Sequence, residues 1–160
     1  LCFPFWTAAA EKAYFDYQID KKYLAGIVLS GAEVKSLRLK HASLAGSYIK
    51  ALNKDSKKPE LFLINAQINA YRFAGQNQDY DPKKTRKLLL KRREIEELVT
   101  ASEQKSYSII PLAFLLEHNQ IKLELALAKG KKSFEKRETI KKRDLNRELN
   151  QKLKRSQFKI

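Results

Sequence analysis

Two neighbouring apolar stretches near the end of the chain constrain its fold more than any other feature. Residues 106–116 read SYSIIPLAFLL and residues 121–128 read IKLELALA, with only the turn residues 117–120 between them. Apolar residues alternate without a break in the second stretch, which is the pattern of a strand with one face in a core. The sequence therefore predicts an antiparallel hairpin that needs further sheet to pack against.

Further strand patterns supply that sheet. Residues 13–19 alternate with period two, residues 24–29 are rich in aliphatics, and strands at 47–52 and 61–68 flank the polar loop 53–60. Six short strands with only two helices favour a small closed barrel over a βαβ sheet. The expected fold class is thus mainly β with flanking helices.

Two helices are expected between these strands. In SGAEVKSLR, Ser30 and Glu33 stand at the spacing of a capping box, which predicts a short helix. The segment DPKKTRKLLLKRREIEELVTASEQ predicts a helix at 82–99, with Asp81 as its cap and Pro82 at its first position.

Basic residues crowd the first turn of the predicted helix at 82–99. Each cation there is disfavoured by the helix dipole by roughly 0.3–1 kcal/mol. A bound phosphate would compensate this unfavourable placement, so the cluster indicates an RNA-facing surface; a solvated, solubilising surface is the alternative. The residues concerned are Lys83, Lys84, Arg86 and Lys87, with Lys91, Arg92 and Arg93 extending the charge.

The net charge of +15 is concentrated at the C-terminus. From Lys129 onward there are 13 basic and 4 acidic residues, a net charge of +9, which leaves +6 for the first 128 residues. Such a distribution favours a polyanionic partner, either nucleic acid or an acidic membrane surface. No apolar run approaches the roughly 18 residues that a membrane span requires.

The basic tail has little to bury. Its apolar stripe consists of Ile140, Leu145, Leu149 and Leu153, and no Gly or Pro follows Gly130. Four aliphatic side chains cannot offset the entropy lost on ordering the segment. We therefore expect residues 131–160 to be disordered in the free protein and helical on a partner, residues 12–130 to form the barrel domain, and residues 1–11 to lie outside its core.

Few residues favour catalysis or metal binding. Cys2 is the only cysteine, so a reducing compartment is the default, and the two histidines are scattered. The first ten residues, LCFPFWTAAA, indicate a truncated or mis-assigned start. Asp20 and Glu33-Val-Lys35 superficially match the spacing of metal-dependent nucleases, but that chemistry needs the Glu-x-Lys pair on a strand. We expect no cofactor, no metal and no enzymatic activity.

Three longer motifs are more specific. AGIVLSGAEVKSLR (25–38), DPKKTRKLLLKRREI (81–95) and LALAKGKKSFEKRETIKKR (125–143) strongly resemble the SmpB family, the SsrA-binding proteins of bacterial trans-translation. The resemblance implies an oligonucleotide-binding-fold (OB-like) barrel that binds the tRNA-like domain of transfer-messenger RNA (tmRNA) and helps deliver it to stalled ribosomes. It also implies that the tail enters the empty mRNA channel of the small ribosomal subunit, in a cytoplasmic protein with no membrane partner that we expect to be a monomer.

Motif positions carry two sets of residues over from the family. The tmRNA-binding set is Glu33, Lys35, Ser36, Arg38, Lys83, Lys84, Arg86, Lys87 and Leu89. The set for the ribosomal decoding centre is Lys129, Lys131, Lys132, Phe134, Lys136, Arg137, Ile140, Lys141, Lys142 and Arg143. Phe134 falls where the family usually has an aromatic residue or histidine able to stack on RNA.

Four positions depart from the usual family pattern. They are Ala10, Phe15, Leu24 and Lys91, where the family often has polar residues. Extra lysines can restore affinity through phosphates, but phosphate contacts carry little specificity. A basic RNA- or ribosome-associated structural protein without selectivity for tmRNA is therefore the alternative function.

Overall fold

The computed structural model describes residues 3–5, 13–52, 59–72, 80–104 and 106–131. Its elements in chain order are β1 (Phe3–Phe5), β2 (Tyr17–Ile27), α2 (Gly31–Arg38), β3 (Ala42–Ser43), β4 (Tyr48–Leu52), β5 (Glu60–Ile64), β6 (Gln67–Ile68), β7 (Arg86–Leu89), α3 (Arg92–Glu103), β8 (Tyr107–Glu117) and β9 (Gln120–Gly130). Residues 13–16 are helical as well.

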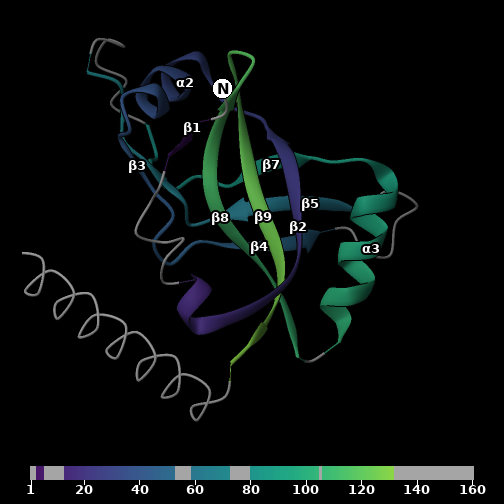
Figure 1. The fold of residues 1–160 in the computed structure, drawn as a ribbon. Coiled ribbons are helices and arrows are strands. Elements are labelled where there is room, and N and C mark those ends of the chain that lie inside the picture. The colour runs from purple at the N-terminus through teal and green to yellow at the C-terminus, as the bar shows by residue number, and fades with distance from the viewer. Residues whose placement is uncertain (1–2, 6–12, 53–58, 73–79, 105, 132–160) are drawn as a thin grey trace, which may run out of the picture.

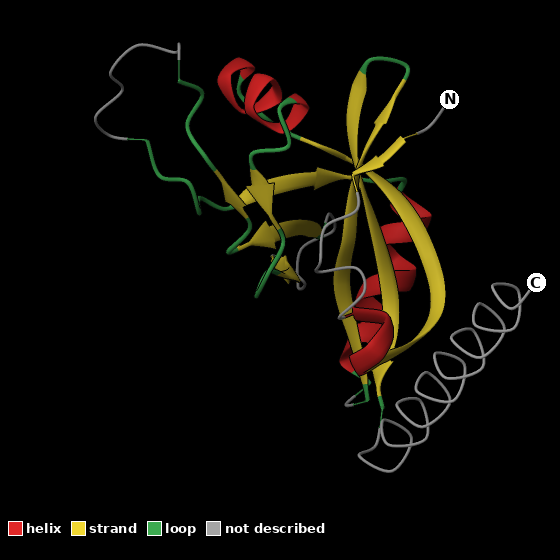
Figure 2. Cartoon of the chain, turned by 60° about the vertical axis from the view of Figure 1, so that its left-hand side comes forward, coloured by secondary structure: helices red, strands yellow, loops and turns green. Residues whose placement is uncertain are grey.

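One antiparallel sheet of seven strands, in the order β1-β8-β9-β2-β7-β5-β4, forms the body. It curls so that β4 at one edge lies beside β8, and the long strands β8, β9 and β2 cross β7, β5 and β4 (Figure 1). Figure 2 shows the same sheet from the side, with the helices outside it. The expectation of a mainly β, OB-like barrel with flanking helices is confirmed.

The barrel is not closed by a hydrogen-bonded ladder between β4 and β8. Pro111 on β8 has no backbone N–H, and the β8–β9 register shifts between Pro111 and Ala113. Both features are typical of a stretch of strand edge that does not accept another strand, and β1 pairs with this edge only further along, at residues 114–116. An open seam therefore runs between β4 and β8.

Apolar side chains fill the barrel and also cover one part of its outside. Leu61, Leu63, Leu123 and Leu125 have no exposed surface inside the barrel, and each buried leucine contributes about 1.5–3 kcal/mol. A second, smaller cluster packs the helical segment 13–16 onto the outer face of the β8–β9 hairpin. These two clusters explain why the hairpin is apolar over most of its length.

The β8–β9 hairpin and the helix at Ser30 are confirmed. His118 and Asn119 have φ of 46° and 65°. A two-residue hairpin turn of type I′ requires positive φ at both central residues. At the start of α2, Ser30 N donates to Glu33 Oε2 at 2.7 Å and Glu33 N donates to Ser30 Oγ at 3.4 Å. This is the predicted capping box.

The predicted helix at 82–99 is wrong in its first half. Residues 86–89 form strand β7 between β2 and β5, and α3 begins only at Arg92. Asp81 is no helix cap either: its Oδ1 accepts from Lys83 N at 2.8 Å within a turn. Lys83, Lys84, Arg86 and Lys87 therefore lie on a turn and a strand, where no helix dipole opposes them, whereas Arg92 and Arg93 begin α3.

Strand boundaries near the N-terminus also differ from prediction. The strands expected at 13–19 and 24–29 form one strand, β2, with a register shift between Ile19 and Lys21, and residues 13–16 are helical. The strand expected at 61–68 divides into β5 and β6. Residues 3–5, for which no strand was predicted, pair with β8 as the edge strand β1. The predicted tail beyond Lys131 lies outside the described residues.

Candidate nucleic-acid interface

A buried ion pair joins α2 to β7. Glu33 and Arg86 are 1% and 2% exposed, and Glu33 Oε1 lies 2.9 Å from Arg86 Nε and 2.8 Å from Arg86 Nη2. Both residues belong to the predicted tmRNA-binding set. Their burial leaves almost no surface for direct contact with RNA, so their part in this structure is to hold other residues in place.

Arg86 also holds the turn before β7. Its Nη1 donates to the carbonyls of Ala66 at 2.7 Å and Lys84 at 2.9 Å, and its Nη2 donates to that of Pro82 at 3.0 Å. The planar guanidinium has enough fixed donors to serve three carbonyls and a carboxylate together. The backbone at 82–84 is therefore fixed against α2 by one side chain.

The Glu33 carboxylate is stabilised in its charged form. Burial opposes ionisation, but the hydrogen bond from Ser30 N and the pairing with Arg86 outweigh it, so the pKa of Glu33 is lowered. Lys84 Nζ lies 3.2 Å from Glu33 Oε2 and adds to this effect. The three charged groups together leave an excess of one positive charge.

Three lysines lie around this buried pair and form what we call the α2–β7 corner: Lys35 and Lys83, which are exposed, and Lys84, which is partly exposed. Lys35 Nζ lies 5.4 Å from the ring centre of Tyr71, and Lys84 Nζ lies 5.9 Å from that of Tyr80. Tyr80 OH donates to Ile68 O at 2.8 Å, which fixes the ring. The corner thus presents ammonium groups over two aromatic rings.

Lys87 and Leu89 lie on the outer face of the sheet, opposite to the face on which Arg86 is buried. Lys87 pairs with Glu60 on the neighbouring strand. Leu89 is 53% exposed and lies beside Gly26, where a Cβ atom would come within 3.3 Å of Leu89 Cβ. The missing side chain at Gly26 leaves an apolar surface beside a lysine, which suits contact with a ribose or base.

Two further predicted residues tie α2 to its surroundings. Arg38 Nη2 donates to Asn119 Oδ1 at 2.7 Å in the hairpin turn, and Ser36 Oγ donates to Asn69 O at 2.6 Å. Ser36 has no exposed surface, whereas Arg38 is exposed. The structure therefore brings the α2 residues and Lys83, Lys84 and Arg86 together, and places Lys87 and Leu89 on the adjoining sheet face.

The tail leaves from the opposite end of the hairpin. Lys131 N donates to Asp16 O at 3.0 Å, and Lys131 Nζ donates to Tyr14 O at 2.9 Å. The 11 residues of β9 separate this point from the turn beside α2, a distance of about 35 Å at strand rise. Lys129 is exposed, and the other predicted tail residues lie outside the described part of the chain.

Sequence reasoning missed Tyr71 and Tyr80 as parts of the corner. Tyr80 stands in a segment rich in turn formers, and only the folded backbone places it next to Glu33. Among the described residues, no group of three or more acidic, histidine or cysteine side chains could hold a metal ion. In that same part of the chain, no helix is long and apolar enough to cross a membrane.

Comparisons with known proteins agree on one family. The model of the SmpB protein family matches residues 7–155. An SsrA-binding protein of Geobacter metallireducens is 46% identical over 144 residues, covering 90% of each chain. One of Caldicellulosiruptor saccharolyticus is 46% identical over 147 residues, covering 92% of this chain and 89% of that one. A chain from the solved structure "tmRNA-SmpB: a journey to the center of the bacterial ribosome" matches with a TM-score of 0.59 and 39% identity, over 74% of this chain and 80% of that chain.

Proposed function

Because the chain belongs to the SmpB family, we propose that it binds the tRNA-like domain of tmRNA and acts with it on stalled ribosomes in trans-translation. The observation that carries this proposal, beyond family membership, is the α2–β7 corner. A buried ion pair holds the backbone there, so that Lys35 and Lys84 lie over tyrosine rings and Lys83 is exposed beside them.

The corner suits a folded RNA better than an unstructured polyanion. Lysine ammonium groups at fixed positions contact phosphates and thereby set the position and orientation of the RNA. The apolar surface at Leu89 and Gly26 adds a contact of a different kind on the adjoining face. Glu33, Ser36 and Arg86 act as positioning residues, while Lys35, Lys83, Lys84, Lys87 and Leu89 supply the contacts.

The tail has a separate task in this proposal. It enters the empty mRNA channel of the small subunit, where its basic residues contact ribosomal RNA and Phe134 stacks at the decoding centre. The separation of about 35 Å along β9 supports this division. RNA bound at the corner leaves the start of the tail uncovered.

The test is a salt-titrated affinity of the full chain for the tRNA-like domain of tmRNA, with an ordinary tRNA as competitor. Selective binding near physiological salt supports the proposal. Equal binding of both RNAs that falls steeply with salt would indicate the alternative, a basic RNA-associated protein without selectivity. The substitutions Lys35→Gln and Lys84→Gln should each weaken binding of the tRNA-like domain, whereas Arg93→Gln on the exposed face of α3 should not.

A further inference from the structure

The open seam between β4 and β8 widens into a groove that the proposed function does not use. The groove has a volume of about 620 Å³ and is walled by residues 47–51 and 107–111, with the helical segment 13–16 and Tyr17 at one side. Pockets of 300–1,000 Å³ are typical of small-molecule and cofactor sites. The seam groove is therefore large enough for one organic ligand of nucleotide size.

The groove lies at the tail end of the hairpin, away from the α2–β7 corner. Tyr107 of its wall pairs in register with Lys129 near the end of β9, whereas the corner adjoins the hairpin turn at Asn119. Contacts to RNA in the seam groove would thus be additional to those at the corner.

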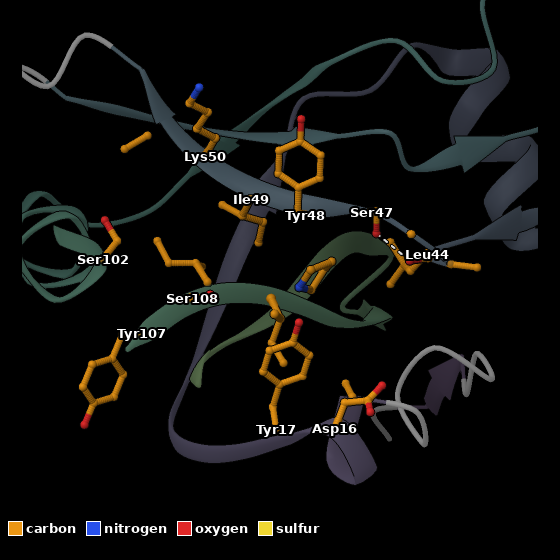
Figure 3. Close-up of a pocket in the computed structure, with 17 residues that line it drawn as sticks. Asp16, Tyr17, Leu44, Ser47, Tyr48, Ile49, Lys50, Ser102, Tyr107 and Ser108 are labelled. Atoms are coloured by element: carbon orange, nitrogen blue, oxygen red, sulfur yellow. Dashed lines mark hydrogen bonds between the residues drawn. The ribbon is translucent and has the colours of Figure 1, made fainter. Parts of the chain in front are cut away.

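The chemistry of the lining is apolar and aromatic with hydroxyl groups at the rim. Figure 3 shows Ile49 directed from β4 toward β8, and the Tyr17 ring directed toward the groove from the side of the helical segment. Pro111 also lines the groove from β8, although it is buried. A flat aromatic ligand can stack on the Tyr17 ring, and the hydroxyls of Ser102 and Ser108 can hydrogen-bond its edge.

Charge around the groove favours an anionic ligand. Lys50 belongs to the lining on the β4 side. On the other side, Lys131 is held against Tyr14 and Asp16 by two hydrogen bonds, and Lys129 is exposed nearby. Lys129 and Lys131 therefore lie beside a cavity whose lining includes one carboxylate, that of Asp16, while Figure 3 shows the Lys50 ammonium directed away from β8.

A polypeptide strand fits this place less well. An added strand would need backbone partners along the edge of β8, and Pro111 has no N–H to offer. The register shift next to Pro111 bends that edge further out of line. Of the ligands that match the ring surfaces and the flanking lysines, a nucleotide has both a flat base and a phosphate.

We propose that the seam groove binds an unpaired nucleotide of single-stranded RNA, with its base against the Tyr17 ring and a flanking phosphate on Lys131. Stacking of a base on an aromatic ring is worth about 1–3 kcal/mol. The groove gives the protein a second RNA contact beside the start of the tail, which holds a single-stranded segment rather than a folded domain.

The experiment uses the full chain, uridine monophosphate and a short oligouridine. Nuclear magnetic resonance should show the largest shifts on adding either probe at the amides of Ser108 and Ile109. In parallel, fluorescence anisotropy with the oligouridine should show that Tyr17→Leu weakens binding about tenfold, while Tyr17→Phe retains it. Leucine preserves apolar packing against the hairpin, so the fold should remain. Tyr14→Leu, which removes an exposed tyrosine outside the groove, is the matched control.

Three results would overturn the proposal. One is an equal loss for Tyr17→Leu and Tyr14→Leu, or shifts that avoid the groove. A second is an equal loss of affinity for the tRNA-like domain with Tyr17→Leu, which would place Tyr17 in the surface of the proposed function. The third is that Ile140→Asp and Leu145→Asp shift the same amides without RNA, because the tail itself would then fill the groove.

Discussion

Removal of Arg86 is the sharpest test of how the α2–β7 corner is built. The substitution Arg86→Met keeps most of the side-chain length but leaves Glu33 buried and without its main partner. Breaking a buried ion pair from one side typically costs 3–5 kcal/mol. The carbonyls of Ala66, Lys84 and Pro82 also lose a donor. We expect the free energy of unfolding to fall by at least about 3 kcal/mol.

Two further variants separate the buried pair from its surroundings. Lys84→Met removes the exposed partner of Glu33, whose side chain is 42% accessible, so solvent screening limits the loss to about 1 kcal/mol. The double variant Glu33→Gln with Arg86→Met removes the buried charge and should be less destabilised than the sum of the two single changes.

Urea unfolding of the full chain, with the midpoint and slope fitted together, measures these differences. For a chain of this size, a loss of 3–5 kcal/mol lowers the melting temperature by roughly 6–20 °C. The reasoning is refuted if Arg86→Met is no more destabilising than Lys84→Met. It is refuted as well if the double variant shows simple additivity, because the buried charge would then carry no penalty.

Three other expectations concern charge. Glu33→Gln should flatten the pH dependence of the free energy of unfolding. Because the pKa of Glu33 is lowered in the folded protein, the ionised carboxylate contributes its full stability above the unfolded-state pKa of about 4.3, and this contribution is lost as pH falls through the folded-state pKa. Unfolding measured across an acid titration tests this. The combination of Lys35→Gln and Lys84→Gln should reduce the slope of log affinity against log salt for the tRNA-like domain by about 1–2; an unchanged slope would mean that neither lysine contacts a phosphate. Leu24→Glu would set a carboxylate opposite Glu124 and should destabilise the fold by roughly 0.2–1 kcal/mol, with recovery when Glu124→Gln is added; thermal melts decide this.

Local patterns predicted the elements whose signals are complete within a short segment. The unbroken alternation of β9 needs no partner to be recognised, and the capping box at Ser30 involves only residues three apart. The Glu33 side chain, in contrast, reaches Arg86 across 53 positions in the sequence. No local pattern indicates that contact, so its burial could not be predicted.

The error at β7 has a specific cause. A strand with Arg86 and Leu88 facing inward does not look like an alternation of apolar residues, because one inward residue is charged. Leucines, lysines and arginines are also good helix formers, so this segment was predicted as the first half of the helix that contains α3. The segment is a strand because it pairs with β2 and β5 on either side. A local sequence pattern does not indicate this pairing.

The division of β2 was mispredicted for a related reason. The polar run Asp20-Lys21-Lys22 interrupts the pattern in sequence, but in the structure a register shift lets the strand continue through it with both lysines exposed. From residue types alone, polar residues at a bulge are predicted as a loop between two strands. The corner residues Tyr71 and Tyr80 were missed in the same way, since their neighbours belong to other elements.

The length of the β8–β9 hairpin sets the distance between the α2–β7 corner and the start of the tail in any complex that binds both of them at once. Adding two residues to each strand would lengthen the separation between the α2–β7 corner and the start of the tail by about 7 Å. Every side chain would stay on its face of the sheet. A single added residue would exchange the buried and exposed faces beyond it. Changes of hairpin length in relatives should therefore come in even steps, and should be rare unless the RNA changes its dimensions as well.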